Sequence, residues 1–306
     1  MSLLMRLFSR GVSAAPHAAE PSSMARLEPV LLDIQATLNA LYRTQLYHYQ
    51  EASWSARERL LASADFDAPL RLERHGYKVY SQNDEDGIIA EIFRRIGTTN
   101  RLFLEFGVEN GLENNTLNLL TEGWSGCWIE AAAKDAAAIR QRFASALNGG
   151  RLQFRESLVD SDNINALIEA FRLPREIDFL GIDIDGNDYH VWKAIDAISP
   201  RVVVIEYNAK FRPPSGWVMA YDPRHSWDGT DQYGASLAAL TALAGEKGYR
   251  LVGCSIVGSN AFFVRADLAQ DRFPEPATAE HLYQPARHFL TPGYVSGHKP
   301  GFGKGS

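Results

Sequence analysis

Five short apolar runs alternate with amphipathic stretches in the middle of this chain, and no other feature restricts its fold as strongly. The runs are hydrophobic almost throughout: residues 101–106, 127–130, 152–154, 179–182 and 202–205. The stretches between them have helical spacing: residues 114–120, 134–147, 163–171 and 189–198. Strands that alternate with helices in this way form βαβ units, and strands buried on both faces lack a polar alternation. The pattern predicts a parallel sheet covered by helices on both faces.

The last part of this pattern breaks the parallel arrangement. Residues 235–247 have helical composition and end at Gly248, and two apolar runs follow at 249–255 and 260–264. Strands joined by so short a turn must be antiparallel. We therefore predict an α/β fold: a Rossmann-like, seven-stranded, mostly parallel sheet with a terminal antiparallel hairpin, helices on both faces and an N-terminal helical extension.

The chain divides into four segments by composition. Residues 1–23 form a predicted flexible leader, although Arg6 and Arg10, with no acid before Glu20, also fit a transit peptide or a weak membrane-surface helix. Three further segments follow: a helical extension over 24–65, a catalytic domain over 66–265 and an extended surface tail, rich in Pro, Gly and His, over 266–306.

The helical extension repeats apolar residues at helical spacing, namely Leu27, Val30, Leu31, Ile34, Leu38, Leu41 and Leu46. This spacing indicates an apolar face but does not reveal whose surface covers it. Two interpretations stay open: packing against the chain's own domain, or a homodimer formed through the N-terminal helices.

Composition restricts the class of function. The 306 residues are 45% hydrophobic and 22% charged, as in ordinary globular proteins, and the net charge of −6 disfavours nucleic acid as a partner. No apolar run is long enough to span a bilayer, so we expect no transmembrane segment and a cytoplasmic location. Cys127 and Cys254 lie inside apolar runs and indicate buried, reduced thiols rather than a disulfide or a zinc site.

A glycine-containing turn follows the first predicted strand. Gly107 and Gly111 let the backbone turn tightly and approach a ligand closely. Their spacing is G-x-x-x-G, without the third glycine that dinucleotide-binding loops use. The second strand ends at Glu130, whose carboxylate is placed to accept both hydroxyls of an adenosine ribose; a solvated acid at a helix start is the simpler alternative.

Carboxylates also follow the fourth and fifth predicted strands. Asp183, Asp185 and Asp188 come after the fourth, and Glu206 with Asn208 comes after the fifth. Like charges this close resist joint ionisation unless a cation or hydrogen bonds compensate them. The candidate ligands for a divalent cation such as Mg²⁺ are Asp183, Asp185, Glu206 and Asn208. Alternatively, Asp183 orients a bound ligand while Asp185 and Asp188 cap the next helix.

In these stretches the chain resembles the FkbM-type methyltransferases, a branch of the class I family that uses S-adenosyl-L-methionine (SAM). The matching segments are residues 80–92 (YSQNDEDGIIAEI), 103–116 (FLEFGVENGLENNT), 124–130, 178–192 (DFLGIDIDGNDYHVW), 202–208 and 233–265. They span nearly the whole predicted domain. The resemblance implies SAM as cofactor and methyl transfer to hydroxyl groups, often those of sugars, glycans or natural products.

Carried over position by position, the resemblance assigns the SAM contacts to Glu105, Gly107, Gly111, Glu130, Val159, Asp160 and Asp183. In this assignment Glu130 contacts the ribose, and Val159 with Asp160 borders the adenine. Glu105 departs from the commoner Asp-x-Gly form of the first motif by one methylene, which puts its direct contact with the donor in doubt.

Methyl transfer to an alcohol needs a base or a metal, because a hydroxyl is a poor nucleophile at neutral pH. The candidate catalytic residues are Asp183, His190 and His225; a surface position on its helix would explain His190 equally well. Residues 209–232 form a long segment with aromatic, Arg and Asp side chains, which predicts either a substrate lid or a surface insertion packed by its own aromatics.

The sequence thus predicts a SAM-dependent O-methyltransferase that acts on a hydroxyl of a sugar, glycan or related natural product. Two alternatives stay open. One is a nicotinamide-dependent oxidoreductase on a Rossmann-like sheet, which the missing third glycine and the hairpin disfavour. The other is a non-catalytic scaffold that keeps the methyltransferase fold.

Overall fold

The computed structural model describes residues 23–290. The predicted leader up to residue 22 and the end of the predicted tail, residues 291–306, lie outside the described residues. The chain divides into two units, residues 1–51 and 52–306, and helix α1 (Ser23–Leu61) begins in the first and ends in the second. No helix in the described part of the chain is long and apolar enough to cross a membrane.

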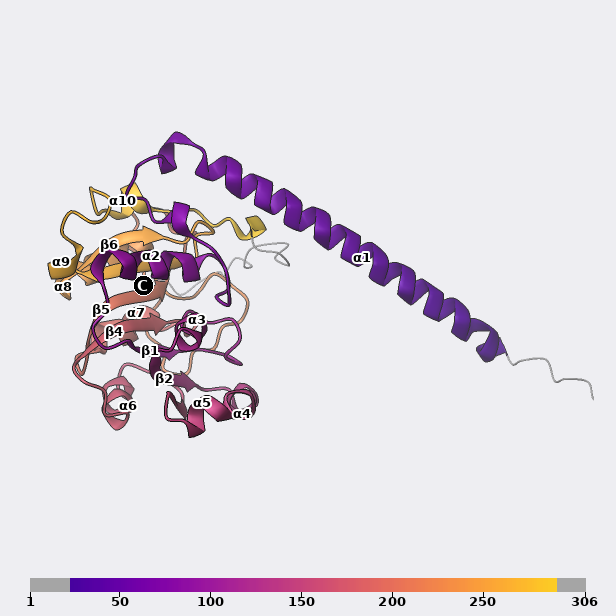
Figure 1. The fold of residues 1–306 in the computed structure, drawn as a ribbon, viewed down its shortest axis with the longest axis horizontal. Helices are drawn as coiled ribbons and strands as arrows, with labels where there is room; N and C mark the ends of the chain where they lie inside the picture. The colour runs from indigo at the N-terminus through magenta and orange to yellow at the C-terminus, as the bar shows by residue number, and fades with distance from the viewer. Residues whose placement is uncertain (1–22, 291–306) are drawn as a thin grey trace, which may run out of the picture. The chain divides into compact units, whose positions relative to one another are not determined.

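A seven-stranded sheet forms the centre of the second unit (Figure 1). Its strands are β1 (Leu102–Phe106), β2 (Ser125–Glu130), β3 (Leu152–Glu156), β4 (Glu176–Ile182), β5 (Ser199–Glu206), β6 (Tyr249–Cys254) and β7 (Asn260–Arg265). The strand order is β3-β2-β1-β4-β5-β7-β6. The first five strands pair in parallel, whereas β7 pairs antiparallel with both β5 and β6. The predicted fold class, with its terminal antiparallel hairpin, is confirmed.

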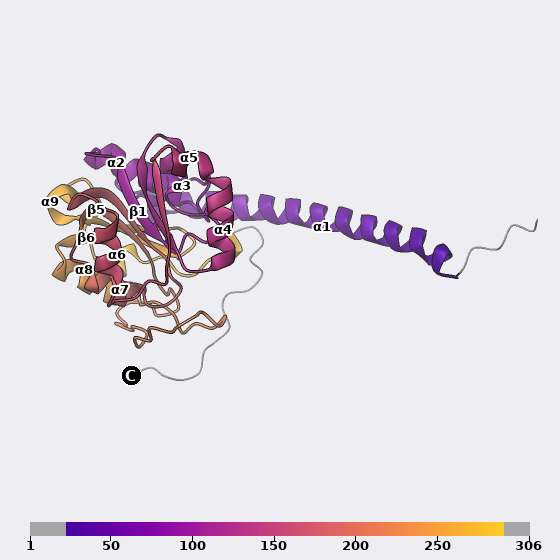
Figure 2. The ribbon, with the colours of Figure 1, turned by 90° about the horizontal axis from the view of Figure 1, so that it is seen from below.

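Helices cover both faces of this sheet (Figure 2). One face carries α2 (Glu85–Ile96), α3 (Leu117–Thr121), α4 (Ala133–Arg142) and α5 (Ala144–Asn148). The other face carries α6 (Ile164–Ala170), α7 (Asp188–Ala194) and α8 (Leu237–Glu246). Successive side chains of a strand point to opposite faces, so Phe103 packs in the first layer and Leu104 in the second. Both faces are apolar, which is why the strands read as unbroken hydrophobic runs.

The amino ends of β4 and β5 are closed by a buried ion pair. Arg201 donates to the Asp178 carboxylate (2.8 Å) and to the backbone carbonyl oxygens of Ile96 and Gly97, which end α2. Asp178 also accepts the backbone N–H groups of residues 99–101. Burial pushes the pKa of Asp178 upward, but Arg201 and these N–H donors outweigh it, and the pKa lies below its ordinary value.

Helix α2 was not among the predicted helices, although its residues 85–92 lie in the matching segment 80–92. Its amino end is held by Asp86, which accepts the backbone N–H groups of Val79, Tyr80 and Ser81. This local capping orders the segment that leads into the sheet.

The prediction of an extended surface tail is wrong for residues 266–290. This segment forms α9 (Ala266–Ala269), α10 (Ala279–Leu282) and a 3₁₀ turn, η3 (His288–Leu290). Phe273 and Leu282 are buried, and the Tyr207 hydroxyl donates to the Gln284 carbonyl oxygen (2.6 Å). The Pro and Gly content suggested a surface tail, but a few apolar side chains of this segment pack on the domain.

Candidate functional site

The strand order reverses between β1 and β4, where parallel sheets bind ligands at their carboxyl ends. The ends of these two strands touch at Gly107. This residue has φ +76°, and a methyl group on its Cα would lie 1.4 Å from the Asp183 carbonyl oxygen. Glycine is therefore required at position 107 by backbone conformation and by contact. The close approach that we predict for Gly107 is made to the backbone after β4.

Gly111 has a different role from Gly107. Its φ is +79°, and a methyl group there would lie 2.7 Å from the ring of Phe143 and 3.0 Å from that of Trp128. These two rings pack edge to face, with centroids 4.8 Å apart. Gly111 thus lets the end of the loop settle on this aromatic pair.

Glu105, on β1, supports the same loop from inside the domain. Its buried carboxylate accepts the N–H groups of Asn115 (2.9 Å) and Thr116 (3.1 Å) and the Thr116 hydroxyl (2.5 Å). Burial raises the pKa of Glu105 to about 7, although these hydrogen bonds oppose the increase. The carboxylate is committed to the turn before α3, so Glu105 is a positioning residue for the glycine loop.

Glu130 lies at the end of β2, next to the glycine loop. One carboxylate oxygen accepts the Glu109 N–H (2.8 Å) and the other accepts the Ala132 N–H (2.7 Å). Glu109 itself has a left-handed backbone, with φ +48°. A carboxylate offers about four acceptor sites, so Glu130 keeps acceptor capacity while it holds the loop.

The loop after β3 borders the same edge of the sheet. Val159 is buried, and the Asp160 carboxylate accepts the backbone N–H groups of Asp162 (2.9 Å) and Asn163 (2.8 Å). Asp160 therefore fixes the turn into α6.

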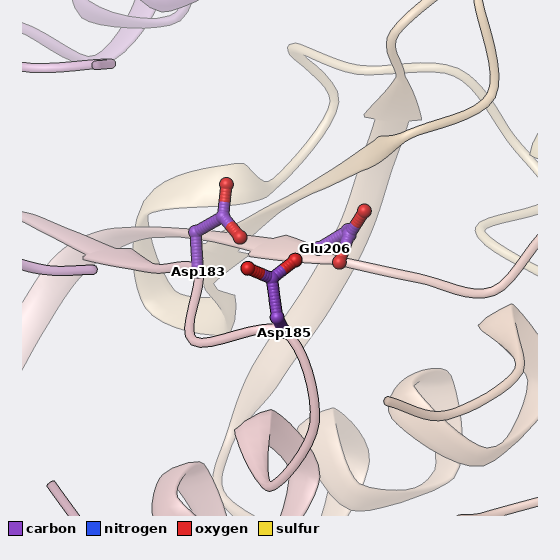
Figure 3. A group of neighbouring side chains, drawn as sticks. All are labelled: Asp183, Asp185 and Glu206. Atoms are coloured by element: carbon purple, nitrogen blue, oxygen red, sulfur yellow. The ribbon is translucent and has the colours of Figure 1, made fainter. Parts of the chain in front are cut away.

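Three carboxylates after β4 and β5 face one another (Figure 3). Asp183, Asp185 and Glu206 each offer an oxygen, and these oxygens lie within 4.8 Å of one another. One oxygen of Glu206, Oε2, is buried and has no hydrogen-bond partner. The sequence prediction that these acids meet at one edge of the sheet is thus confirmed for three of the four candidate metal ligands.

The fourth candidate, Asn208, is committed elsewhere. Its amide nitrogen donates to the carbonyl oxygens of Asp231 (2.8 Å) and Tyr233 (3.2 Å), and its Oδ1 accepts the Lys210 N–H (3.2 Å). The buried amide of Asn208 thus satisfies the backbone at the end of the 209–232 segment, and its role as a metal ligand stays a prediction.

The carboxylates of this cluster repel one another. Burial, followed by this repulsion, raises the pKa values of Asp183 and Glu206 well above their ordinary range. The same causes raise the pKa of Asp185 to about 6, although the nearby His225 opposes the increase. Asp188 is better compensated, because it accepts the backbone N–H groups of Ile184 and Gly186 (both 2.8 Å). Groups with raised pKa values at a strand-end crevice mark a candidate functional site.

Each candidate histidine contacts a backbone carbonyl, and His225 lies beside this cluster. The His225 Nε2 atom is 3.0 Å from the Asp185 carbonyl oxygen, and its ring occupies the space where Gly186 lacks a side chain. The His190 Nε2 atom is 2.8 Å from the Met219 carbonyl oxygen, and its ring packs edge to face on Tyr221. A carbonyl oxygen only accepts, so Nε2 carries the proton in both residues and Nδ1 is the basic atom when the ring is neutral.

The 209–232 segment is anchored to the carboxylate loop at several points. Asn187 donates to the Asp222 carbonyl oxygen (2.7 Å) and accepts the Asp222 N–H (3.3 Å). Further along, Gly234 N donates to the Gly186 carbonyl oxygen (2.9 Å). Sequence reasoning missed Asn187 as an anchor. No local pattern identifies it, since its partner is 35 residues away in the sequence.

No family model matches the chain, and no curated protein sequence matches it. Several solved structures do. A putative caffeoyl-CoA O-methyltransferase from Staphylococcus aureus is 14% identical, over 74% of this chain and 99% of its own, with a TM-score of 0.41. An O-methyltransferase from Bacillus cereus in complex with SAH is 17% identical, over 71% and 89%, with a TM-score of 0.37. The N-terminal domain of EvdMO1, with SAH bound, is 14% identical, over 64% and 90%, with a TM-score of 0.36. At these values the likeness carries no conclusion about chemistry, which must come from the site itself.

Proposed function

We propose that this chain transfers a methyl group from SAM to a hydroxyl group, as its resemblance to the FkbM-type methyltransferases implies. The observation that carries the proposal is the group of carboxyls at the carboxyl edge of the sheet, whose ionised form a bound cation would favour. Glu130, Asp183, Asp185, Asp188 and Glu206 lie at or just after the carboxyl ends of parallel strands. Among the described residues, none of them forms an ion pair with a lysine or an arginine. A positively charged ligand would compensate this charge.

Charge separates this proposal from the oxidoreductase alternative. The sulfonium and ammonium groups of SAM are positive, whereas the pyrophosphate of a nicotinamide dinucleotide is negative. Phosphates bind where glycine-rich loops present backbone N–H groups. Here Glu130 accepts the Glu109 N–H, so a carboxylate already occupies a backbone donor of the glycine loop. The edge favours a cation and disfavours a dinucleotide.

The residues at this edge fit SAM. Glu130 keeps acceptor capacity for the two ribose hydroxyls. Gly107 lets the glycine loop lie close against the backbone at the end of β4. Val159 is buried and would give the adenine an apolar border, and Asp183 lies directly after β4 at the same edge of the sheet. SAM supplies an electrophilic methyl group when it is bound; the chain must orient the acceptor, exclude water and accept a proton.

His225 is the proposed proton acceptor. Its Nε2–H donates to the Asp185 carbonyl oxygen, which leaves Nδ1 free to take a proton from an acceptor hydroxyl. His190 is held by Met219 and Tyr221. We expect His225→Gln to lower the turnover number about 100-fold or more while SAH affinity stays within about twofold. His190→Gln is the matched control. Equal losses in both variants would contradict the assignment.

We infer that the acceptor is a sugar, a glycan or a related polyhydroxylated compound. The 209–232 segment exposes Tyr221 and Trp227 and also contains Arg212 and Asp228, and its anchors hold it next to the carboxylate cluster. Aromatic faces with a few charged groups suit a ligand that has apolar ring faces and many hydroxyls. A screen of sugar and nucleotide-sugar acceptors with labelled SAM, followed by product mapping, tests this assignment. Turnover with any acceptor would also eliminate the non-catalytic scaffold.

A divalent cation such as Mg²⁺ is the second ligand that we propose for this edge. Asp183, Asp185 and Glu206 are hard oxygen donors at ligand-to-ligand spacing, and the Oε2 atom of Glu206 is buried without a hydrogen-bond partner among the described residues. We expect Mg²⁺ to raise the melting temperature of EDTA-treated protein by a few degrees, and Asp183→Asn to abolish this increase. If neither EDTA nor Mg²⁺ changes the activity or the melting temperature, the proposed cation site is contradicted and SAM is the only ligand proposed for the cluster.

Titration calorimetry with SAH tests the proposed function directly. We expect binding, and we expect Glu130→Gln to weaken it by about tenfold or more, because a charge-assisted hydrogen bond is lost. Glu156→Gln is the matched control: Glu156 ends β3, pairs in register with Glu130 and contacts Arg140 on the surface. Absence of SAH binding, or binding of NADH in its place, would sink the proposal.

A further inference from the structure

Helix α1 exposes a row of large aliphatic side chains to solvent. Their exposed fractions are 54% for Leu27, 63% for Leu31, 48% for Ile34, 60% for Leu38 and 61% for Leu41. All five lie in the first unit of the chain, residues 1–51. A few single exposed leucines are normal on a monomer, but a continuous apolar row of this length indicates a surface that another molecule covers.

The spacing of this row is that of a coiled coil. Starting at Leu27, the steps are four, three, four and three residues, which places Leu31 and Leu38 at a positions and Leu27, Ile34 and Leu41 at d positions. We call these five residues the seam. A row of alternating three- and four-residue steps stays on one side of a helix and fits the equivalent row of a second helix.

We propose that the seam pairs with the α1 seam of a second copy of this chain. The residues beside the seam support an identical partner. The e position beside Leu27 is Glu28, but the e and g positions between residues 30 and 44 hold Val30, Gln35, Thr37, Tyr42 and Thr44, which carry no charge. Two copies therefore meet without like charges facing each other, in either orientation of the helices.

A membrane surface is a poorer occupant of the seam than a second copy. Helices that lie in a lipid interface are rich in Lys and Arg on their polar face. Between residues 27 and 51 the sequence has Glu28, Asp33 and Glu51 against a single basic residue, Arg43. An anionic lipid surface would be repelled rather than attracted.

The same heptads limit the strength of the pairing. The next a position holds Gln45 and the next d position His48, so the apolar part of the seam is about two heptads long. A polar residue at an a position reduces stability but fixes the register of the pair. We therefore expect a reversible, concentration-dependent dimer with a dissociation constant of about 1–50 µM.

Sedimentation velocity of the full chain at about 1 and 100 µM tests the proposal, because mass action moves a reversible dimer across this range. We expect the sedimentation coefficient to increase with concentration. The double variant Ile34→Glu with Leu38→Glu should stay monomeric at both concentrations. Its matched control is Ala36→Glu with Ala40→Glu, which adds the same two charges to exposed positions outside the seam, and which should dimerise like the unaltered chain.

Circular dichroism and SAH calorimetry on both double variants distinguish this proposal from the proposed function. Unchanged helicity shows that a monomeric seam variant has lost pairing rather than its helix. SAH affinity should be the same in all three proteins. An unaltered chain that is monomeric at both concentrations, a seam variant that behaves like its control, or binding to anionic vesicles in place of self-association would overturn the pairing of α1.

Discussion

Carboxylates lie at both ends of strands β4 and β5, and the two ends are opposite in character. Asp178 at the amino ends is fully buried, whereas the carboxylates at the carboxyl ends are half-buried or exposed. At the amino ends, Asp178 is paired with Arg201 and accepts backbone N–H groups, and its pKa is lowered. At the carboxyl ends, Asp183 and Glu206 face each other and Asp185 without a basic partner, and their pKa values are raised. The same strands therefore hold one site where charge is satisfied and one where it is not.

This difference separates stability from function within one pair of strands. A charge that is fully paired and hydrogen-bonded completes the fold and leaves nothing for a ligand to supply. Unpaired charge lowers stability in the free protein, and a protein retains it where a ligand compensates it. The loops that bind ligands in open α/β sheets lie at the carboxyl ends of the strands, where the uncompensated charge is found.

The largest expected effect is at the amino end. Arg201→Met leaves Asp178 buried without its cation and also removes donors from Ile96 and Gly97. We expect the free energy of unfolding to fall by about 3–5 kcal/mol. Arg265→Met is the matched control: Arg265 pairs with Glu176 at the same edge of the sheet but is partly exposed, so its loss should cost less than about 1 kcal/mol. Urea unfolding of both variants measures the two losses in free energy of unfolding. Similar losses would contradict the special role of the buried Asp178–Arg201 pair.

The second effect concerns how closely the backbone after β1 approaches the backbone after β4. Gly107→Ala places a methyl group against the Asp183 carbonyl oxygen at φ +76°, and we expect a loss of about 3 kcal/mol or more together with loss of SAH binding. Gly123 also has a positive φ, +88°, but nothing lies within 4 Å of an added methyl group. Gly123→Ala should therefore cost only about 1–2 kcal/mol and leave SAH binding intact. Equal effects at both positions would show that Gly107 is needed only for its backbone conformation and not for its close contact with Asp183.

The smallest expected effect is an increase in the free energy of unfolding, on replacement of Asp183. The pKa of Asp183 in the folded protein is raised, so its contribution to stability is present below its unfolded-state pKa of about 3.8 and is lost as the pH rises through the folded-state pKa. Asp183→Asn cannot ionise. We expect the variant to match the unaltered chain near pH 4 and to exceed it by about 1–2 kcal/mol near pH 8, while it binds SAH more weakly.

Urea unfolding at several pH values measures this difference. Asp178→Asn provides the contrast, because the pKa of Asp178 is lowered: its contribution is present above about pH 3.8 and is lost as the pH falls below that value. A variant at position 183 that is destabilised at every pH would show that the cluster is compensated after all.

Between residues 101 and 265 the sequence by itself determined the alternation of strands and helices, the antiparallel hairpin and the placement of carboxylates at strand ends. These features depend on periodicity and on short turns, which are properties of consecutive residues. It also predicted that Asp183, Asp185 and Glu206 meet, because the carboxyl ends of neighbouring parallel strands share one edge of a sheet.

Only the tertiary structure decided which partner each polar side chain takes. Glu105 turns to the start of α3, Asn208 turns to the end of the 209–232 segment, and Asp178 pairs with Arg201 from the next strand. The tail up to residue 290 packs on the domain for the same reason. Each of these choices depends on groups far away in the sequence that reach the same point in space, and a buried polar or apolar group is stable only when such a partner is there.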